Sequence, residues 1–79
     1  MPLQVRLSAS LRRLAPGYDA LRGLEADWRP GLTVAGLLAQ LGIAPQEVKI
    51  IMLNGRAAGL GDHLADGDRV GLFPAVGGG

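Results

Sequence analysis

The sequence ends in three consecutive glycines, and the group with the clearest chemical use is the backbone carboxylate that we expect at Gly79. A terminal carboxyl has an ordinary pKa of about 3.3 to 3.7, so at neutral pH it is an anion and a poor electrophile. It must be activated first, and ATP can supply the phosphate leaving group. Gly77 and Gly78 allow the backbone to thread a narrow channel because they have no Cβ atoms to collide with its walls. The ending therefore predicts a tail that enters another protein's active site.

Such a tail needs a folded body to carry it. Ordering each glycine costs roughly 1 to 2 kcal/mol of conformational entropy, so contacts made elsewhere must offset that loss. We expect a folded domain over residues 1–74 that docks against the partner, followed by a flexible tail over residues 75–79. A frayed terminus without function is the alternative, and the native-looking segment Phe73-Pro74-Ala75-Val76 before the glycines argues against it.

The remaining residue types offer little chemistry of their own. The chain has no cysteine, which excludes disulfides, thiolate zinc sites and a cysteine nucleophile. His63 is the only histidine, and no serine or carboxylate stands at a diagnostic spacing from it, so we expect a solvated loop position and no metal site. Asp66 and Asp68 flank Gly67, which indicates a turn rather than an acid–base pair. We expect no catalytic side chain.

Charge and hydropathy exclude two classes of partner. The eight basic and seven acidic residues are interspersed and leave a net charge of +1, so no electrostatic footprint for nucleic acid is present. No stretch approaches 18 apolar residues, which argues against a membrane span. With 79 residues, of which 48% are hydrophobic, we expect one small cytoplasmic domain stabilised by packing alone.

The first half of the chain predicts two strands that pair with each other. Apolar and polar residues alternate over residues 3–8, which is the period of a strand with one buried face. A second alternation over residues 24–29 predicts a strand that stops at Pro30-Gly31. Between them, two leucines three apart in residues 11–14 indicate a short helical turn.

The strongest local pattern is a helix over residues 34–41. Thr33 is a suitable N-cap because its hydroxyl can accept from a free amide of the first turn. Gly42 can adopt the left-handed conformation that ends a helix, and Pro45 prevents its resumption. The apolar residues in between recur at helical spacing and form one stripe directed at the sheet, made of Val34, Leu37, Leu38 and Leu41.

Three further strands are predicted after the helix. Residues 48–53 form a nearly continuous β-prone run that reads as an inner strand, and Asn54-Gly55 after it is a tight-turn signal into a short return strand over residues 56–58. Asp66-Gly67-Asp68 makes a turn into the last strand, residues 69–73. The predicted order is β-β-α-β-β-β, with one helix covering one face of the sheet.

Nearly the whole chain resembles the MoaD/ThiS family of ubiquitin-like sulfur carriers. The resemblance implies an α+β fold, the ubiquitin-like β-grasp, with a mixed sheet and one main covering helix. It rests on Leu32-Thr33-Val34 through Leu37-Leu38, on residues 48–55 with the Asn54-Gly55 turn, on Leu64-Ala65-Asp66-Gly67-Asp68-Arg69-Val70 and on Phe73-Pro74-Ala75-Val76-Gly77-Gly78-Gly79.

The resemblance also implies a reaction at Gly79. In this family a ubiquitin-activating-type enzyme uses ATP and magnesium to adenylate the terminal glycine, and a sulfur donor then converts it to a thiocarboxylate. The sulfur passes to an acceptor enzyme, such as the large subunit of molybdopterin synthase or thiazole synthase. Catalysis lies on the partners, so the chain itself is expected to be a carrier with no bound cofactor and not an enzyme.

Two branches of the family compete. The chain length and the helical turn over residues 11–14 resemble MoaD, the small subunit of molybdopterin synthase, and favour sulfur donation to the molybdenum or tungsten cofactor. The ending Val76-Gly77-Gly78-Gly79 departs from the Ala-Gly-Gly common in MoaD and leans toward ThiS, the carrier for the thiazole of thiamine. The sequence also fits a ubiquitin-like protein modifier or a non-covalent β-grasp interaction module.

The same strands suggest a partner interface. Phe73 is out of phase with Val70 and Leu72, so we expect it on the sheet face away from the helix, where an exposed aromatic can anchor a partner. Ile51 and Leu53 are out of phase with Val48, Ile50 and Met52 and are predicted to extend that patch. Pro74 and Val76 continue it toward the tail. Ordinary core packing is the alternative for Phe73 and Ile51. The scattered arginines Arg56 and Arg69 either pair with acids on the activating enzyme or are plain surface charge.

Overall fold

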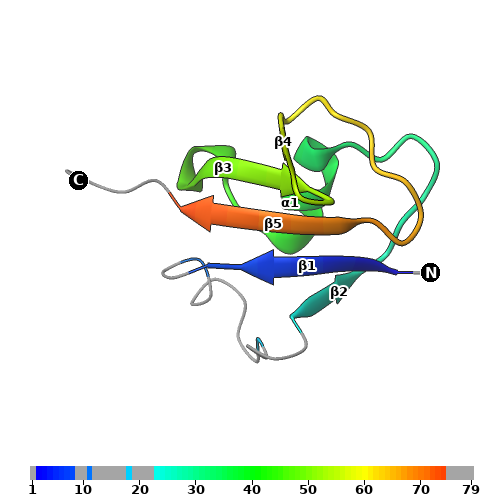
Figure 1. The fold of residues 1–79 in the computed structure, drawn as a ribbon, viewed down its shortest axis with the longest axis horizontal. Helices are drawn as coiled ribbons and strands as arrows, with labels where there is room; N and C mark the ends of the chain where they lie inside the picture. The colour runs from blue at the N-terminus through cyan, green and yellow to red at the C-terminus, as the bar shows by residue number, and fades with distance from the viewer. Residues whose placement is uncertain (1, 9–10, 12–17, 19–22, 75–79) are drawn as a thin grey trace.

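The computed structural model describes residues 2–8, 11, 18 and 23–74, and shows a five-stranded sheet with one helix against one of its faces (Figure 1). The strands lie in the order β2-β1-β5-β3-β4, so the last strand occupies the centre of the sheet. The elements are β1 (Leu3–Leu7), β2 (Leu24–Ala26), α1 (Val34–Leu41), the 3-10 turn η2 (Pro45–Glu47), β3 (Val48–Leu53), β4 (Arg56–Ala58) and β5 (Arg69–Pro74).

The sheet is mixed because its first and last strands are parallel neighbours. β1 pairs in parallel with β5, while β1 with β2, β5 with β3 and β3 with β4 are all antiparallel. The hairpin between β3 and β4 closes at Asn54-Gly55, where both residues have positive φ (51° and 83°), as a type I′ turn requires. The predicted element order and the α+β class are confirmed.

The predicted bounds of α1 are confirmed by its two caps. Thr33 is extended at φ −106° and ψ 171°, and its hydroxyl accepts from the Gly36 amide at 3.2 Å. Gly42 takes the left-handed conformation at φ 74°, and its amide donates to the carbonyls of Ala39 and Leu38. At eight residues α1 is far shorter than the roughly 20 that span a bilayer, and the described residues include no membrane-crossing helix.

The loop between β4 and β5 satisfies two more amides at the start of α1. The Val34 amide donates to the Asp62 carbonyl at 3.0 Å, and the Ala35 amide donates to the Leu60 carbonyl at 2.9 Å. Together with the Thr33 hydroxyl, these carbonyls bind three amides that otherwise lack a partner inside the helix. The helix is therefore anchored to the loop as well as to the sheet.

The core lies between α1 and the helix-side face of the sheet. Of the predicted helix stripe, Val34, Leu37 and Leu38 are buried, and Leu41 is half-buried against the same cluster. The alternation in β1 and β5 buries one side of each strand, as predicted. The buried hydrophobic residues are Leu3, Val5, Leu7, Leu11, Leu32, Val34, Leu37, Leu38, Ile43, Ile51, Leu64, Val70 and Leu72.

The second strand is shorter than its alternation predicts. β2 ends at Ala26 instead of continuing to residue 29. The indole Nε1 of Trp28 donates to the Leu64 carbonyl at 2.7 Å. The segment after Ala26 therefore contacts the loop between β4 and β5 and does not continue as a strand. The helical turn predicted over residues 11–14 lies outside the described residues except for Leu11, which is buried.

The two turn motifs of the second half hydrogen-bond to each other. The Asn54 side chain donates to Asp68 Oδ1 at 2.9 Å and accepts from the Arg69 amide at 2.9 Å. Asp68 Oδ2 accepts from the Ala65 amide at 2.7 Å, and the Asn54 amide donates to the Arg69 carbonyl at 2.8 Å. This clamp, defined here as Asn54 with Asp68, fixes the point at which β5 enters the sheet, and it gives Asp68 the structural role predicted for it.

Replacing Asp68 with alanine is expected to destabilise the fold by about 1 to 3 kcal/mol, because two hydrogen bonds to a carboxylate are lost. Urea unfolding followed by circular dichroism measures the effect. Asp27→Ala is the control, since Asp27 is exposed and its carboxylate takes no part in the clamp. Equal stability of the two variants would mean that the clamp does not hold β5.

Candidate functional site

The candidate site is the sheet face that points away from α1, called the outer face here. β5 lies at the centre of this face. Successive side chains of β5 point to opposite sides of the sheet, so Val70 and Leu72 are buried in the core and Phe73 is exposed on the outer face. Figure 1 shows β5 between β1 and β3. The outer face comprises Gln4, Arg6, Glu25, Ile50, Met52, Ala57, Arg69, Gly71 and Phe73.

Phe73, Ile50 and Met52 form an apolar patch on the outer face. Phe73 is 38% exposed and lies opposite Ile50, which is 50% exposed and is the most exposed large hydrophobic residue described. Met52 lies opposite Gly71, which precedes Phe73 by two positions on the same face. The prediction that Phe73 lies outside the core is confirmed.

The predicted place of Ile51 and Leu53 in this patch is wrong, because Leu53 lies opposite the buried Val70 and Ile51 is buried on the same side of the sheet. Ile51 shows this most clearly. Its side chain is only 8% exposed and lies opposite the buried Leu72, on the helix side of the sheet. The register between β3 and β5 is irregular between Val48 and Ile50, and from Ile50 onward the pairing with β5 sets which side of β3 meets the core. Three residues of the outer face were not predicted from the sequence as site residues, namely Ile50, Met52 and Gly71.

The polar side of the outer face lies over β1 and the start of β5. Arg6 and Arg69 are exposed there, and Gln4 donates to Glu25 Oε2 at 3.2 Å. A shallow hollow opens between the apolar patch and the two arginines, lined by Arg6, Met52, Asn54, Gly55, Arg69, Val70, Gly71 and Phe73. Apolar and cationic groups therefore border one depression.

The other predicted site residues lie at or beyond the end of β5. Pro74 is half-buried as the last residue of the strand and lies opposite Val48. Val76 and the three glycines Gly77, Gly78 and Gly79 lie outside the described residues. Arg56 lies opposite Leu53 and is therefore on the helix side of the sheet, away from Arg69.

The remaining candidates for side-chain chemistry are not brought together. His63 is exposed in the loop that bridges to Thr33, as predicted. Among the described ranges, no three His, Cys, Asp or Glu residues are grouped as a metal ion would need.

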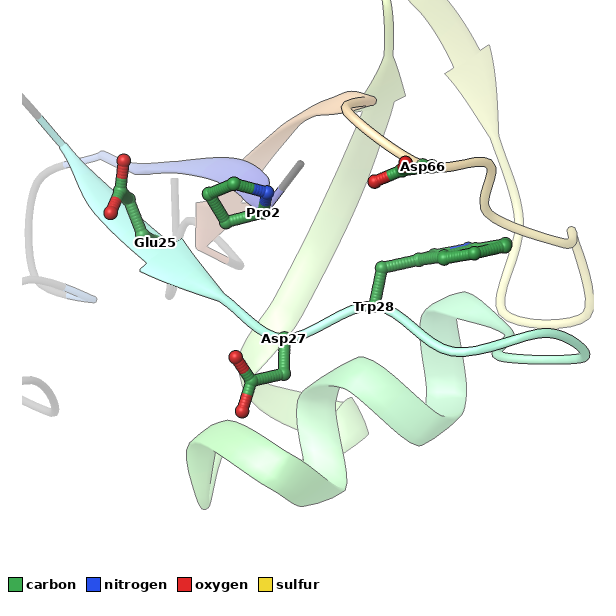
Figure 2. A pocket seen from close by; sticks show the side chains of 5 residues that line it. All are labelled: Pro2, Glu25, Asp27, Trp28 and Asp66. Atoms are coloured by element: carbon green, nitrogen blue, oxygen red, sulfur yellow. The ribbon is translucent and has the colours of Figure 1, made fainter.

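A second depression carries acidic residues, and Figure 2 shows how they lie. Its lining consists of Pro2, Glu25, Asp27, Trp28 and Asp66. The three carboxylates point in different directions and do not converge on one point (Figure 2). Asp66 precedes β5, whereas Pro74 ends it, so this depression lies at the opposite end of the strand from the tail.

The chain is similar to solved structures over its full length. The crystal structure of SAMP1 from Haloferax volcanii has 29% identity and a TM-score of 0.72, and the match covers 100% of both chains. A second crystal structure, of small archaeal modifier protein 1 from H. volcanii, has 27% identity and a TM-score of 0.73 over 95% of this chain and 98% of that chain. These neighbours confirm the ubiquitin-like β-grasp.

A third structure supports the fold alone. The putative molybdopterin converting factor, subunit 1, from Pyrococcus furiosus has 24% identity and a TM-score of 0.71, covering 96% of this chain and 99% of that chain. No curated protein matches the sequence. The model of the ThiS family matches residues 5–79. These residues include the helix, the three terminal glycines and all five strands apart from the first two residues of β1. On this match the chain belongs to the ThiS family.

Proposed function

We propose that this protein is a sulfur carrier whose Gly79 carboxylate is adenylated by a partner enzyme and then converted to a thiocarboxylate. ATP and magnesium serve the partner, and this chain contributes the acyl group and the surface that docks. The observation that carries the proposal is the match to the ThiS family, which extends through Gly79 and so includes the tail itself. The cell compartment proposed for this chemistry is the cytoplasm.

The fold supports the proposal through the position of the tail. Residues 75–79 follow directly on β5, whose outward residue Phe73 is exposed one position before the strand ends at Pro74. A partner that docks on the outer face is therefore adjacent to the root of the tail. Docking there offsets the entropy lost when the glycines are ordered in a channel.

The direct test is intact-mass spectrometry of a sulfur-transfer reaction. With ATP, magnesium, the cognate adenylating enzyme and a sulfur donor, the protein is expected to gain the mass that replacement of one carboxylate oxygen by sulfur gives. Omitting ATP is the matched control, since an unactivated carboxylate anion does not exchange its oxygen. An unchanged mass in the complete reaction, with the enzyme active on another carrier, would contradict the proposal.

For the acceptor we propose an enzyme of molybdopterin synthesis, the large subunit of molybdopterin synthase. Thiazole synthase is the alternative within the family. Loaded carrier incubated with each acceptor and its substrate distinguishes them, because only the true acceptor returns Gly79 to the carboxylate mass in a single turnover.

Protein modification is the second candidate function, and one observation favours it. The 29% identical neighbour SAMP1 belongs to the small archaeal modifier proteins by name, and the match covers both chains completely. Under this candidate the activated Gly79 forms an isopeptide bond with lysines of other proteins. A ladder of conjugates carrying an N-terminally tagged chain in lysate, absent when Gly79 is deleted, would support it, and a single unconjugated band would contradict it.

Replacing Phe73 with alanine is expected to weaken docking to the activating enzyme while leaving the fold nearly unchanged. The ring is 38% exposed and lies outside the core cluster, so its removal costs little packing. Calorimetric titration measures the affinity, and thermal unfolding measures the stability. Loss of several kcal/mol of stability with unchanged affinity would mean that Phe73 stabilises the sheet and does not contribute to docking.

A further inference from the structure

We infer that Lys49 is the amine that captures the activated Gly79 of the same chain and closes the tail onto β3 through an isopeptide bond. The inference rests on the proposed function, in which Gly79 is adenylated, and adds a second fate for the activated carbonyl. It assigns a modification site to a residue that takes no part in the core.

The composition of the chain leaves one side-chain amine. Lys49 is the only lysine among the eight basic residues, and the other seven are arginine. A guanidinium stays protonated in proteins and does not act as a nucleophile, whereas a lysine amine does so once it has lost its proton. The chain has no cysteine, so no thiol competes for the acyl group. A side-chain amide can therefore form at one position.

Lys49 lies beside the point where the tail leaves the sheet, and Figure 1 shows the start of β3 next to the end of β5. The pairs on either side of it are Val48 with Pro74 and Ile50 with Phe73. Two steps of β3 thus match one step of β5, and Lys49 is the extra residue. It is exposed, and its ammonium makes no ion pair or hydrogen bond with any described residue. An unpartnered amine is therefore one strand spacing, about 4.8 Å, from the root of the tail.

The length of the tail suits closure onto this amine. Residues 75–79 follow Pro74, and a glycine-rich segment of five residues spans about 12 Å on average. The gap to bridge is one strand spacing plus the extended stem of a lysine, at most about 11 Å in all. Linkage within a molecule is most favourable when the average length of the linker matches the span. Closure within one chain is therefore favoured over reaction between two chains.

An amine that precedes β1 is poorly placed to compete. β1 is parallel to β5 and Gln4 pairs with Arg69, so the residues before β1 lie beside the start of β5. β5 has six residues, and a strand rises about 3.3 Å per residue, so that end is roughly 17 Å from Pro74. This distance exceeds the average span of the tail. Position therefore favours Lys49.

The step balances with the reagents of the proposed function. The neutral Nζ of Lys49 attacks the carbonyl carbon of the Gly79 acyl adenylate, a C–N bond forms, and the C–O bond to the phosphate of AMP breaks. AMP leaves with the electron pair of that bond, and one proton of the amine passes to water. The closed chain has lost one water relative to the parent and has no carboxylate at Gly79. Lys49 and the sulfur donor therefore compete for one activated carbonyl.

The enzymatic test omits the sulfur donor. The full chain is incubated with ATP, magnesium and the cognate adenylating enzyme, and the product is examined by intact mass and peptide mapping. A monomer lighter by one water, with Lys49 linked to Gly79, is expected. Lys49→Arg is expected to give no such product and to gain sulfur at the parent rate when the donor is present. Adding the donor to the parent chain is expected to reduce the closed product.

A matched control moves the amine without changing the charge. The double variant Lys49→Arg with Arg56→Lys keeps one lysine and seven arginines. Arg56 is exposed and lies opposite Leu53, at the other end of β3 from Lys49. The double variant is therefore expected to form no closed monomer with the enzyme.

A second arm removes the enzyme from the measurement. The parent and the double variant are produced as Gly79 thioesters by intein cleavage, and closure of each is followed by mass at one pH. The folded parent is expected to close at least about tenfold faster, because its amine is held near the tail. In urea above the unfolding transition the two rates are expected to become similar, because the cost of closing a loop in an unfolded chain depends only weakly on its length.

Three results would each overturn the inference. They are equal closure rates for the two folded thioesters, a closed monomer from Lys49→Arg, and a lysine-linked product found only as a dimer whose yield rises with concentration. If the parent gains sulfur but closes under neither kind of activation, the inference fails and the proposed function stands. If the thioester closes on Lys49 but the enzyme and donor add no sulfur, the proposed function fails and Lys49 remains the acceptor amine.

Discussion

Deleting Gly79, or adding one residue after it, is expected to abolish adenylation while the domain stays folded. Either change moves the reacting carboxylate along the channel by one residue. Displacement of reacting groups by even about 1 Å can cost on the order of a hundredfold in rate, and one extended residue is longer than that. ATP–pyrophosphate exchange with the cognate enzyme measures the rate. Circular dichroism checks that the fold is retained.

A valine at Gly78 is expected to give the same loss for a steric reason. The channel must admit the backbone closely, and the added side chain collides with its walls. Gly61→Val is the matched control, because a Cβ atom at Gly61 has no neighbour within 4 Å. The control is expected to react at the parent rate. If Gly78→Val and the chain lacking Gly79 are adenylated as fast as the parent, the sulfur-carrier proposal is wrong and a non-covalent interaction module is the better account.

Leu38→Ala is expected to destabilise the fold by about 2 to 5 kcal/mol, the cost of a cavity at a fully buried leucine. Leu38 is 0% exposed and is part of the core cluster between α1 and the sheet. Domains of this kind are typically stable by only about 5 to 15 kcal/mol, so the variant loses a large share of the total. Urea unfolding measures the change, and a lower transition midpoint with an unchanged slope is expected.

Leu60→Ala is the matched control for Leu38→Ala. The same atoms are removed, but Leu60 is 39% exposed on the loop that caps α1. Its removal leaves no buried cavity, so a change well below that of Leu38→Ala is expected. Similar losses in the two variants would contradict the assignment of Leu38 to the core.

The helix could be predicted from sequence because its determinants are local. Thr33, the apolar stripe and Gly42 all lie within ten consecutive residues, and the structure places each as predicted. The turn at Asn54-Gly55 is local in the same sense, since both residues tolerate positive φ. The hydrogen bonds between Asn54 and Asp68 were not predictable in this way, because they join two turns separated by a loop and β4.

The outward face of β3 illustrates why the site was only partly predictable. β3 is apolar at nearly every position, so its sequence shows no alternation of apolar and polar residues that would indicate which side meets the core. The phase is set by pairing with β5, which places Ile51 opposite Leu72 and Ile50 opposite Phe73. β5 alternates clearly, and for this reason Phe73 was predicted correctly while Ile51 was not. The hollow at Gly71 follows from the same pairing.

The central position of β5 also governs how the chain must fold. Strands β1 and β5 come from opposite ends of the sequence, yet they are parallel neighbours in the middle of the sheet. Until β5 arrives, β1–β2 and β3–β4 are two separate ribbons with open edges, and each alone is marginal in water. Contacts between residues far apart in sequence slow folding, because a long loop must close before they form. Completion of the sheet therefore awaits the segment that leads into the terminal glycines, so a chain truncated before β5 is expected to lose its fold as well as the proposed reaction at Gly79.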